Sequence, residues 1–239
     1  MTEQSKSSFE YISRKPRKGK AKQLVFLLHG YGKNADLMEK MADEIEARMP
    51  HAPDFLDQPE NEDKNILKIP DDVRLDDDNV PSEMRRQWFS IAFEDQASMR
   101  DEILKVAARF NTFVSAKRDE LGLDDHDIAV MGFSQGGGIA LYSALLRDTN
   151  IGCLVGHSTI FIGDQGLQSK PSTLFLYGAD DSEFTKDVQT TQAIYQESAR
   201  QLAMFLDDLT VKIIDGLQHR TNHDSRTYIA DFIQKKLSL

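Results

Sequence analysis

The stretch DIAVMGFSQGGGIALYSALL, residues 127–146, decides the fold of this chain of 239 residues. It begins with apolar residues that suit a buried strand, and the run after its glycines suits a helix. Between the two lies GFSQG (132–136), a G-x-S-x-G turn from strand to helix. Such a turn strains the backbone of its central serine, and its glycines let strand and helix approach closely. The pattern predicts a nucleophile elbow that presents Ser134 at the carboxyl end of a sheet.

Composition and charge limit the class of protein. Hydrophobic residues make up 40% of the chain and charged residues 28%, which is typical of a soluble globular protein. No apolar run approaches the roughly 20 residues of a membrane span, and the N-terminus lacks the apolar core of a signal peptide. The net charge of −10 argues against nucleic-acid binding. A single cysteine, Cys153, excludes an internal disulfide, so we expect a soluble cytoplasmic protein.

Strand-like and helix-like segments alternate along the chain. Short apolar runs bounded by turn residues predict strands at 23–28, 128–131, 153–155, 173–177 and 210–214. Apolar residues at helical spacing predict helices at 37–49, 95–121, 137–146, 185–206 and 224–237. This alternation predicts a mostly parallel central sheet with helices on both faces. A nucleophile elbow in such a sheet is typical of the α/β-hydrolase fold. The length suits a single domain over residues 1–239.

Two of the later strands end in loops that carry an acid and a histidine, GADDSE (178–183) and DGLQH (215–219). The carboxyl ends of parallel strands meet at one edge of the sheet, so both loops should converge on Ser134. A serine hydroxyl becomes a nucleophile when an imidazole accepts its proton and a carboxylate orients that imidazole. We predict a catalytic triad of Ser134, Asp181 and His219, in the chain order expected for this fold.

Other residues of the right chemical type lie near these partners. Asp180, Glu183 and Asp164 are alternatives for the acid, and adjacent residues point in such different directions that sequence does not settle the choice. His223, four residues after the favoured base, suits the start of a helix. His157 also follows a strand, and we expect it to line a substrate pocket.

The strand at 23–28 runs into the glycine-rich loop HGYGKN (29–34). In this architecture such a loop supplies the second donor of an oxyanion hole. We expect the donors to be the backbone N–H groups of Tyr31 and of Gln135, the residue after the nucleophile. Trp88 and Phe89 form an aromatic pair that would either line an acyl pocket or anchor a loop to the core.

Two segments stand apart in composition. Residues 1–22 form a basic arm, which we expect to be a solvated tail with an edge strand around 9–12. Residues 54–87 are acidic and interrupted by prolines, with a short strand or hairpin at 65–69. This segment is either a lid over the site or a solvated insertion. It lacks the spacing of carboxylates typical of a calcium loop, so we predict no metal.

Together these stretches resemble the phospholipase/carboxylesterase family of α/β hydrolases, which includes acyl-protein thioesterases and small bacterial carboxylesterases. The matching stretches are LVFLLHGYG (24–32), AP (52–53), WF (88–89), GFSQGG (132–137), GADD (178–181) and GLQH (216–219). The resemblance implies a serine esterase or thioesterase that needs no metal or cofactor. It assigns the nucleophile, acid, base and oxyanion amides to Ser134, Asp181, His219, Tyr31 and Gln135.

Three features depart from the family pattern. Ser90 stands where the family usually has an aspartate, and His157 occupies a position that is usually small or polar. The segment 54–87 is long and acidic for the compact bacterial members. These departures leave the triad intact and bear on the acyl-chain preference.

We therefore predict hydrolysis of carboxylic ester or thioester bonds through an acyl-Ser134 intermediate. The expected substrates are small acyl esters or thioesters, acylated proteins or lysolipids, and the expected state is a monomer or homodimer. One alternative is a serine peptidase on the same fold. Another is a non-catalytic binding protein whose acidic insertion recruits a basic partner.

Overall fold

The computed structural model describes residues 9, 12–14, 21–32, 38–48, 64–69, 73–74, 86–90, 95–163 and 166–237. Most of the basic arm (1–22) and of the acidic segment (54–87) lies outside these residues, as does the alternative acid Asp164.

In the described part of the chain, seven strands form one sheet in the order β1-β3-β2-β6-β7-β8-β9. Their bounds are β1 (Ile12–Arg14), β2 (Gln23–Leu28), β3 (Lys64–Ile69), β6 (Ile128–Phe133), β7 (Cys153–His157), β8 (Ser172–Gly178) and β9 (Leu209–Ile214). Neighbouring strands from β3 to β9 run parallel, whereas β1 runs antiparallel to β3 at one edge. The short strands β4 (Val73–Arg74) and β5 (Arg86–Gln87) pair separately. The mostly parallel sheet is as the sequence predicts.

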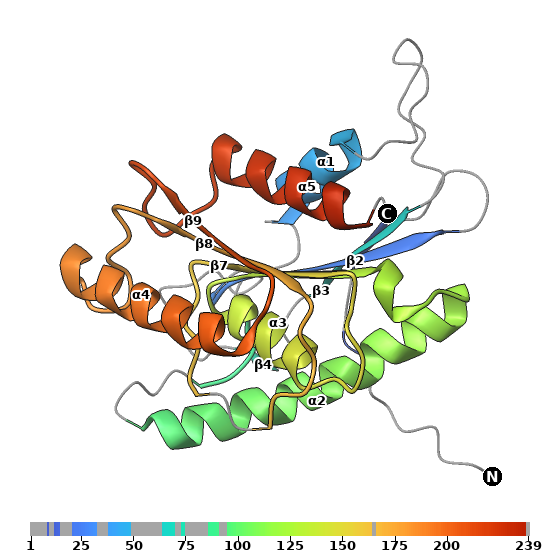
Figure 1. The fold of residues 1–239 in the computed structure, drawn as a ribbon, viewed down its shortest axis with the longest axis horizontal. Helices are drawn as coiled ribbons and strands as arrows, with labels where there is room; N and C mark the ends of the chain where they lie inside the picture. Colours follow the sequence, from blue (N-terminus) through green and yellow to red (C-terminus); the bar gives the residue numbers. More distant parts are fainter. Residues whose placement is uncertain are drawn as a thin grey trace.

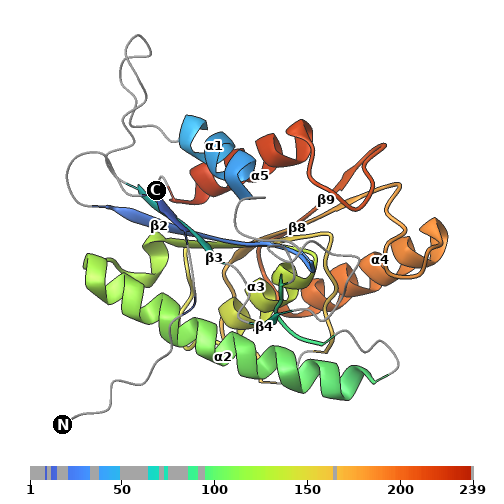
Figure 2. The ribbon, with the colours of Figure 1, turned by 180° about the vertical axis from the view of Figure 1, so that it is seen from behind.

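Helices cover both faces of this sheet. Helices α1 (Glu39–Arg48) and α5 (His223–Leu237) lie on one face, and α2 (Gln96–Leu121), α3 (Gln135–Leu145) and α4 (Val188–Phe205) lie on the other (Figure 1). The reverse view in Figure 2 shows the same two helical layers with the sheet between them. None of the described helices is long and apolar enough to cross a membrane.

Strand β2 explains why the central strands are continuous apolar runs. Its residues 24–28 are fully buried, and they alternate between two cores. Leu24 and Phe26 pack in the core with α2, α3 and α4, whereas Val25 and Leu27 pack in the core with α1 and α5. A strand covered on both faces needs apolar side chains at every position, which removes the polar alternation of a half-exposed strand.

The ends of the helices follow from local capping. Asp95 accepts a hydrogen bond from the Ser98 N–H at the start of α2, and Gly122 ends that helix in the left-handed conformation at φ 69°. Asp187 caps α4 in the same way, so this helix begins three residues later than the sequence predicts. The predicted helix over 37–49 is observed as α1.

Two predicted segments take defined places at the edge of the sheet. The edge strand expected around 9–12 is β1, displaced toward the C-terminus. The strand expected at 65–69 is β3, which lies between β1 and β2. Part of the acidic segment 54–87 is therefore a strand of the central sheet.

Candidate active site

The G-x-S-x-G turn joins β6 to α3, and Ser134 at its centre has φ 54° and ψ −120°. Few non-glycine residues adopt a positive φ, which identifies a locally strained backbone. A Cβ placed on Gly132 would lie 2.2 Å from the Gly136 carbonyl oxygen, and one on Gly136 would lie 2.3 Å from that of His29. Both glycines are therefore required for the close approach of β6, α3 and the loop after β2.

The structure brings Ser134, His219 and Asp181 into one hydrogen-bonded row. The Ser134 Oγ lies 2.8 Å from His219 Nε2, and His219 Nδ1 lies 2.8 Å from Asp181 Oδ2. The imidazole lies between the rings of Phe133 and Phe184, with centroid distances of 5.0 and 5.7 Å. This arrangement fixes the ring orientation that proton transfer from the serine requires.

The carboxylate of Asp181 has no solvent exposure. Burial by itself would raise its pKa, but its hydrogen bond to His219 and the attraction of that ring outweigh burial and hold the pKa below its usual value. A hydroxyl hydrogen from Tyr195 and the backbone N–H of Glu183 add to the lowering. The group is therefore an anion near neutral pH, although it is buried.

The loops that carry Asp181 and His219 are joined through their backbones. Asp180 donates its N–H to the Leu217 carbonyl at 3.0 Å, and Ala179 donates to that of Ile214 at 2.9 Å. A Cβ on Gly178 would lie 2.0 Å from the Leu217 oxygen, so the two loops pass each other in backbone contact. These contacts hold the acid and the base at a constant separation.

The alternative triad members lie elsewhere. The Asp180 side chain is exposed, and Glu183 contributes a backbone N–H to the Asp181 carboxylate. His223 begins α5 and pairs with Glu44 at 2.9 Å, with 71% of its side chain exposed. In the geometry of the described residues, these three groups do not enter the row that contains Ser134.

The backbone segments that carry the two predicted oxyanion donors lie beside Ser134. Gln135 is the first residue of α3, so its N–H lies at the unpaired end of a helix, where the dipole favours negative charge. A Cβ on Gly30 would lie 3.1 Å from the Ser134 Cβ, which brings the loop containing Tyr31 beside the nucleophile. Both backbones thus adjoin the space above Ser134.

The aromatic pair is attached to this loop and to the elbow. Trp88 is fully buried and donates its indole N–H to the His29 carbonyl at 2.8 Å. The Gln135 side chain accepts the Trp88 N–H at 2.8 Å and donates to the Phe89 carbonyl. Trp88 therefore supports the loop by a hydrogen bond from the core, whereas Phe89 lines a cleft beside Ser134.

A narrow apolar cleft of about 40 Å³ adjoins Ser134. Most of its wall is hydrophobic, and polar contributions come from the elbow itself and from a threonine. It is lined by Phe89, Met99, Ile103, Ser134, Gln135, Gly138, Thr159, Ile160, Ile162 and Phe184. Neither Trp88 nor His157 is part of this lining, although the sequence suggested both for the substrate pocket.

His157 is fully buried at the end of β7, and its ring packs edge-on against Phe133. Burial lowers its pKa to about 3, with a smaller contribution in the same direction from His219 and an opposing one from Asp181. His157 is therefore a neutral imidazole close to the triad.

The sequence did not point to Tyr195, whose hydroxyl donates a hydrogen bond to the Asp181 carboxylate. It lies on the buried stripe of α4 with Thr191, Ser198 and Leu202. Three polar residues on the buried side of one helix are unusual, because burying a hydroxyl without a partner is costly. That pattern is the signal that could have found it.

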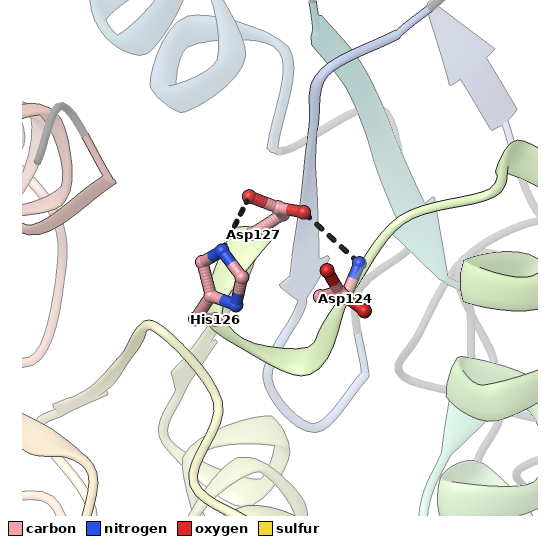
Figure 3. Close-up of side chains that lie close together, drawn as sticks. All are labelled: Asp124, His126 and Asp127. Carbon is pink, nitrogen blue, oxygen red and sulfur yellow. Dashed lines mark hydrogen bonds and ion pairs between the residues drawn. The ribbon is translucent and has the colours of Figure 1, made fainter.

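A separate group of polar side chains precedes β6. Asp124, His126 and Asp127 offer ligand atoms within 4.8 Å of one another, and Figure 3 shows them side by side. The Asp127 carboxylate accepts the Asp124 N–H at 2.9 Å and lies 3.4 Å from His126 Nε2. The contact between Asp124 and Asp127 caps a short 3₁₀ helix, Asp125–Asp127, and we assign no metal to this group.

Comparison with known proteins identifies the family and the fold of the chain. The family model described as Phospholipase/Carboxylesterase matches residues 73–237. A crystal structure of esterase PE8 is similar at 19% identity over 96% of this chain and 99% of that chain, with a TM-score of 0.77. The Bacillus cereus carboxylesterase (16% identity, 98% and 97%, TM-score 0.71) and Arabidopsis thaliana SOBER1 (18%, 91% and 100%, 0.66) share the fold. The chain belongs to the phospholipase/carboxylesterase family of α/β hydrolases.

Proposed function

We propose that this protein is a serine hydrolase that cleaves carboxylic ester or thioester bonds of acyl substrates. The observation that carries the proposal is the continuous row from Ser134 Oγ through His219 to Asp181, with both hydrogen bonds at 2.8 Å. The Ser134 end of the row adjoins an apolar cleft, the first residue of α3 and the loop that contains Tyr31. Membership of a family of esterases supports the same reaction class.

In the first step, the Ser134 oxygen attacks the acyl carbon while His219 Nε2 accepts the hydroxyl proton. The carbonyl oxygen becomes an oxyanion, which accepts hydrogen bonds from the N–H groups of Tyr31 and Gln135. Asp181 stabilises the imidazolium that forms and keeps its Nδ1–H pointing away from the serine. The carbon–oxygen or carbon–sulfur bond then breaks, and His219 returns the proton to the leaving alcohol or thiol.

In the second step, His219 removes a proton from water, and the hydroxide attacks the acyl-serine. The new tetrahedral intermediate collapses, the bond to Ser134 breaks, and the serine oxygen regains its proton from His219. The products are a free carboxylic acid and the restored enzyme. One molecule of water is consumed as co-reactant in the second step, and its oxygen ends in the carboxylic acid.

The cleft suggests which part of the substrate is recognised. Apolar side chains such as Met99, Ile103 and Phe184 surround the space next to the nucleophile. Such walls favour the hydrocarbon part of an acyl group and offer little to a charged one. We therefore assign the cleft to the acyl side of the scissile bond.

Replacement of the nucleophile tests the proposal. Ser134→Ala should abolish turnover of short p-nitrophenyl esters and labelling by a fluorophosphonate probe, because no hydroxyl remains to attack. Ser143→Ala is the matched control. Ser143 is a buried serine of α3, the helix that follows Ser134, and its hydroxyl donates to the Ala140 carbonyl. The control should be labelled like the wild type. Full esterase activity in Ser134→Ala would refute the mechanism.

A further inference from the structure

The triad does not end at Asp181. The Tyr195 hydroxyl donates to Asp181 Oδ2 at 2.6 Å, and this is the same oxygen that accepts the His219 Nδ1–H. The second oxygen, Oδ1, accepts the Glu183 N–H at 3.0 Å. The carboxylate is thus held by three donors, and one of them shares the atom that orients the catalytic imidazole.

Two buried polar side chains lie beyond Tyr195. The Ser158 hydroxyl acts on the pKa of Tyr195 in the downward direction, as a donor to the phenolic oxygen does. The Ser158 Oγ also lies 3.1 Å from His157 Nδ1. Ser158 and His157 are both fully buried. These three side chains connect the end of β7 and the middle of α4 to Asp181.

The direction of every bond in this chain can be assigned. The single hydroxyl hydrogen of Tyr195 is given to Asp181, so its oxygen accepts the hydrogen of Ser158. Ser158 then has no hydrogen left for His157 and must accept one from Nδ1–H. This leaves His157 Nε2 without a proton, and that atom is buried with no hydrogen-bond partner. A bare, neutral Nε2 agrees with the lowered pKa of His157, about 3.

The backbone conformation of Ser158 is unusual for a residue with a side chain. Ser158 has φ 48°, a left-handed conformation that costs a non-glycine residue about 1 kcal/mol or more. Its N–H donates to the Leu176 carbonyl at 2.7 Å, which fixes the turn after β7 against β8. Glycine would adopt this conformation without strain but would supply no hydroxyl.

We propose that His157, Ser158 and Tyr195 form an outer hydrogen-bonded chain that positions Asp181 and sets the basicity of His219. Tyr195 is the positioning residue of this chain, because it alone of the three touches the carboxylate. The inference rests on the proposed hydrolase function and assigns the chain a role within it. All hydrogens in the chain point toward Asp181, so the chain withdraws negative charge from Oδ2.

This geometry fixes the sign of the effect on the imidazole. A carboxylate that shares its charge with a tyrosine hydroxyl stabilises imidazolium less than one that does not. Burial, together with the nearby Asp181 charge, raises the pKa of Tyr195, so the hydroxyl stays a neutral donor. In the described part of the chain, the other ionisable side chains facing this cluster are His157, the exposed Glu183 and Tyr177, which stacks on Tyr195 and whose pKa is raised by burial. Since His157 is neutral above about pH 3, the chain is unchanged over the working range of an esterase.

Tyr195→Phe removes the hydroxyl and keeps the ring, which stacks on Tyr177 at 4.6 Å and meets Phe184 at 5.5 Å. We expect kcat for a short ester to fall about tenfold, the size of a lost hydrogen bond to a charged group. KM should stay constant, because Tyr195 does not line the cleft. In the pH profile of kcat/KM, the acid limb should shift to higher pH by about half a unit.

Tyr177→Phe is the matched control, because it removes a hydroxyl from the stacked partner ring and leaves Asp181 untouched. It should keep both kcat and the position of the acid limb. If Tyr195→Phe keeps the wild-type profile, or if Tyr177→Phe shifts it equally, the outer chain has no role in positioning. An inactive wild type would instead refute the hydrolase proposal.

Two further measurements separate the hydroxyl of Ser158 from its backbone. Ser158→Gly keeps the left-handed turn and should shift the acid limb in the same direction as Tyr195→Phe, by a smaller amount. Nitrogen NMR of ¹⁵N-histidine-labelled Ser134→Ala protein should show His157 as the neutral tautomer with its proton on Nδ1. A proton on Nε2 would overturn the assigned direction of the chain, whether or not the enzyme is active.

Discussion

Asp181 and Asp125 are two carboxylates that the fold treats alike and uses differently. Asp181 follows β8 at the carboxyl edge of the sheet, whereas Asp125 precedes β6 at the opposite edge. In both, burial works to raise the pKa and hydrogen-bonded partners outweigh it, so each pKa lies below its usual value. A lowered carboxylate pKa therefore does not by itself identify the reactive end of the molecule.

The partners make the difference. Asp125 accepts hydrogen bonds from Arg118 at 2.8 Å and from Arg147 at 2.7 Å, and also from the Thr149 hydroxyl. Guanidinium groups keep their charge at every relevant pH, so this ion network does not change and ties α2 to the segment after α3. Asp181 instead faces an imidazole, which gains and loses a proton as the proposed reaction proceeds. An aspartate carboxylate thus stabilises the folded structure at one edge of the sheet, and at the other edge it stabilises a charge that changes during the proposed reaction.

The largest expected effect comes from neutralising the acid at the carboxyl edge. Asp181→Asn should lower kcat for a short ester by about 10⁴-fold, because an amide no longer selects the tautomer of His219 or stabilises imidazolium. Circular dichroism should show that the variant remains folded. Activity within tenfold of the wild type would mean that Asp181 is not the acid of a triad.

The same chemical change at the other edge should give the reverse result. Asp125→Asn leaves Arg147 without its anion and takes from Arg118 one of its two carboxylate partners, which should lower the free energy of unfolding by about 3 kcal/mol. Because the site is far from the cleft, kcat should stay unchanged. Denaturant unfolding and ester turnover on the same sample measure both quantities.

An exposed carboxylate on α4 is the control for that variant. Glu197 pairs with Arg200 on the surface, and its hydrogen bonds to Arg200 and Gln201 lower its pKa to about 2. Solvent screens such a pair, so Glu197→Gln should leave the unfolding midpoint unchanged. A comparable loss of stability in Glu197→Gln would mean that burial of the Asp125 network is irrelevant.

The smallest effect is a dependence on pH that tracks Asp125. Since folding lowers its pKa, the ionised form stabilises the native state above the unfolded value, and this contribution disappears as the pH falls through the folded pKa. The gap in unfolding free energy between wild type and Asp125→Asn should therefore be constant near neutral pH and shrink below about pH 4. Denaturant unfolding at a series of pH values measures this gap. A gap that widens on acidification would contradict the sign of the shift.

Most of the fold could be predicted from local sequence patterns. The elbow could be predicted because contacts close to Ser134 require its glycines. Gly132 approaches the backbone of Gly136, and Gly136 approaches the end of β2. The helix over 95–121 could be predicted because Asp95 and Gly122 mark its two ends. The loops after β8 and β9 could be predicted to converge because parallel strands end at one edge of the sheet.

The remaining features depend on contacts between distant parts of the chain. Tyr195 reaches Asp181 only because α4 packs under β8, and nothing in its neighbouring sequence identifies the partner. Trp88 supports the active site through the backbone of His29, a contact that carries no sequence signature. His157 follows a strand at the correct edge, but its depth of burial is set by the neighbouring Phe133 and Ser158.

The positive φ of Ser134 bears on how this protein could change over time. Glycine would adopt this backbone conformation with the least strain. The side chain on which the proposed chemistry depends therefore lowers the stability of the folded state at this position. Mutational drift toward thermal robustness would therefore tend to erase the nucleophile, and continued turnover of substrate would be the pressure that retains it.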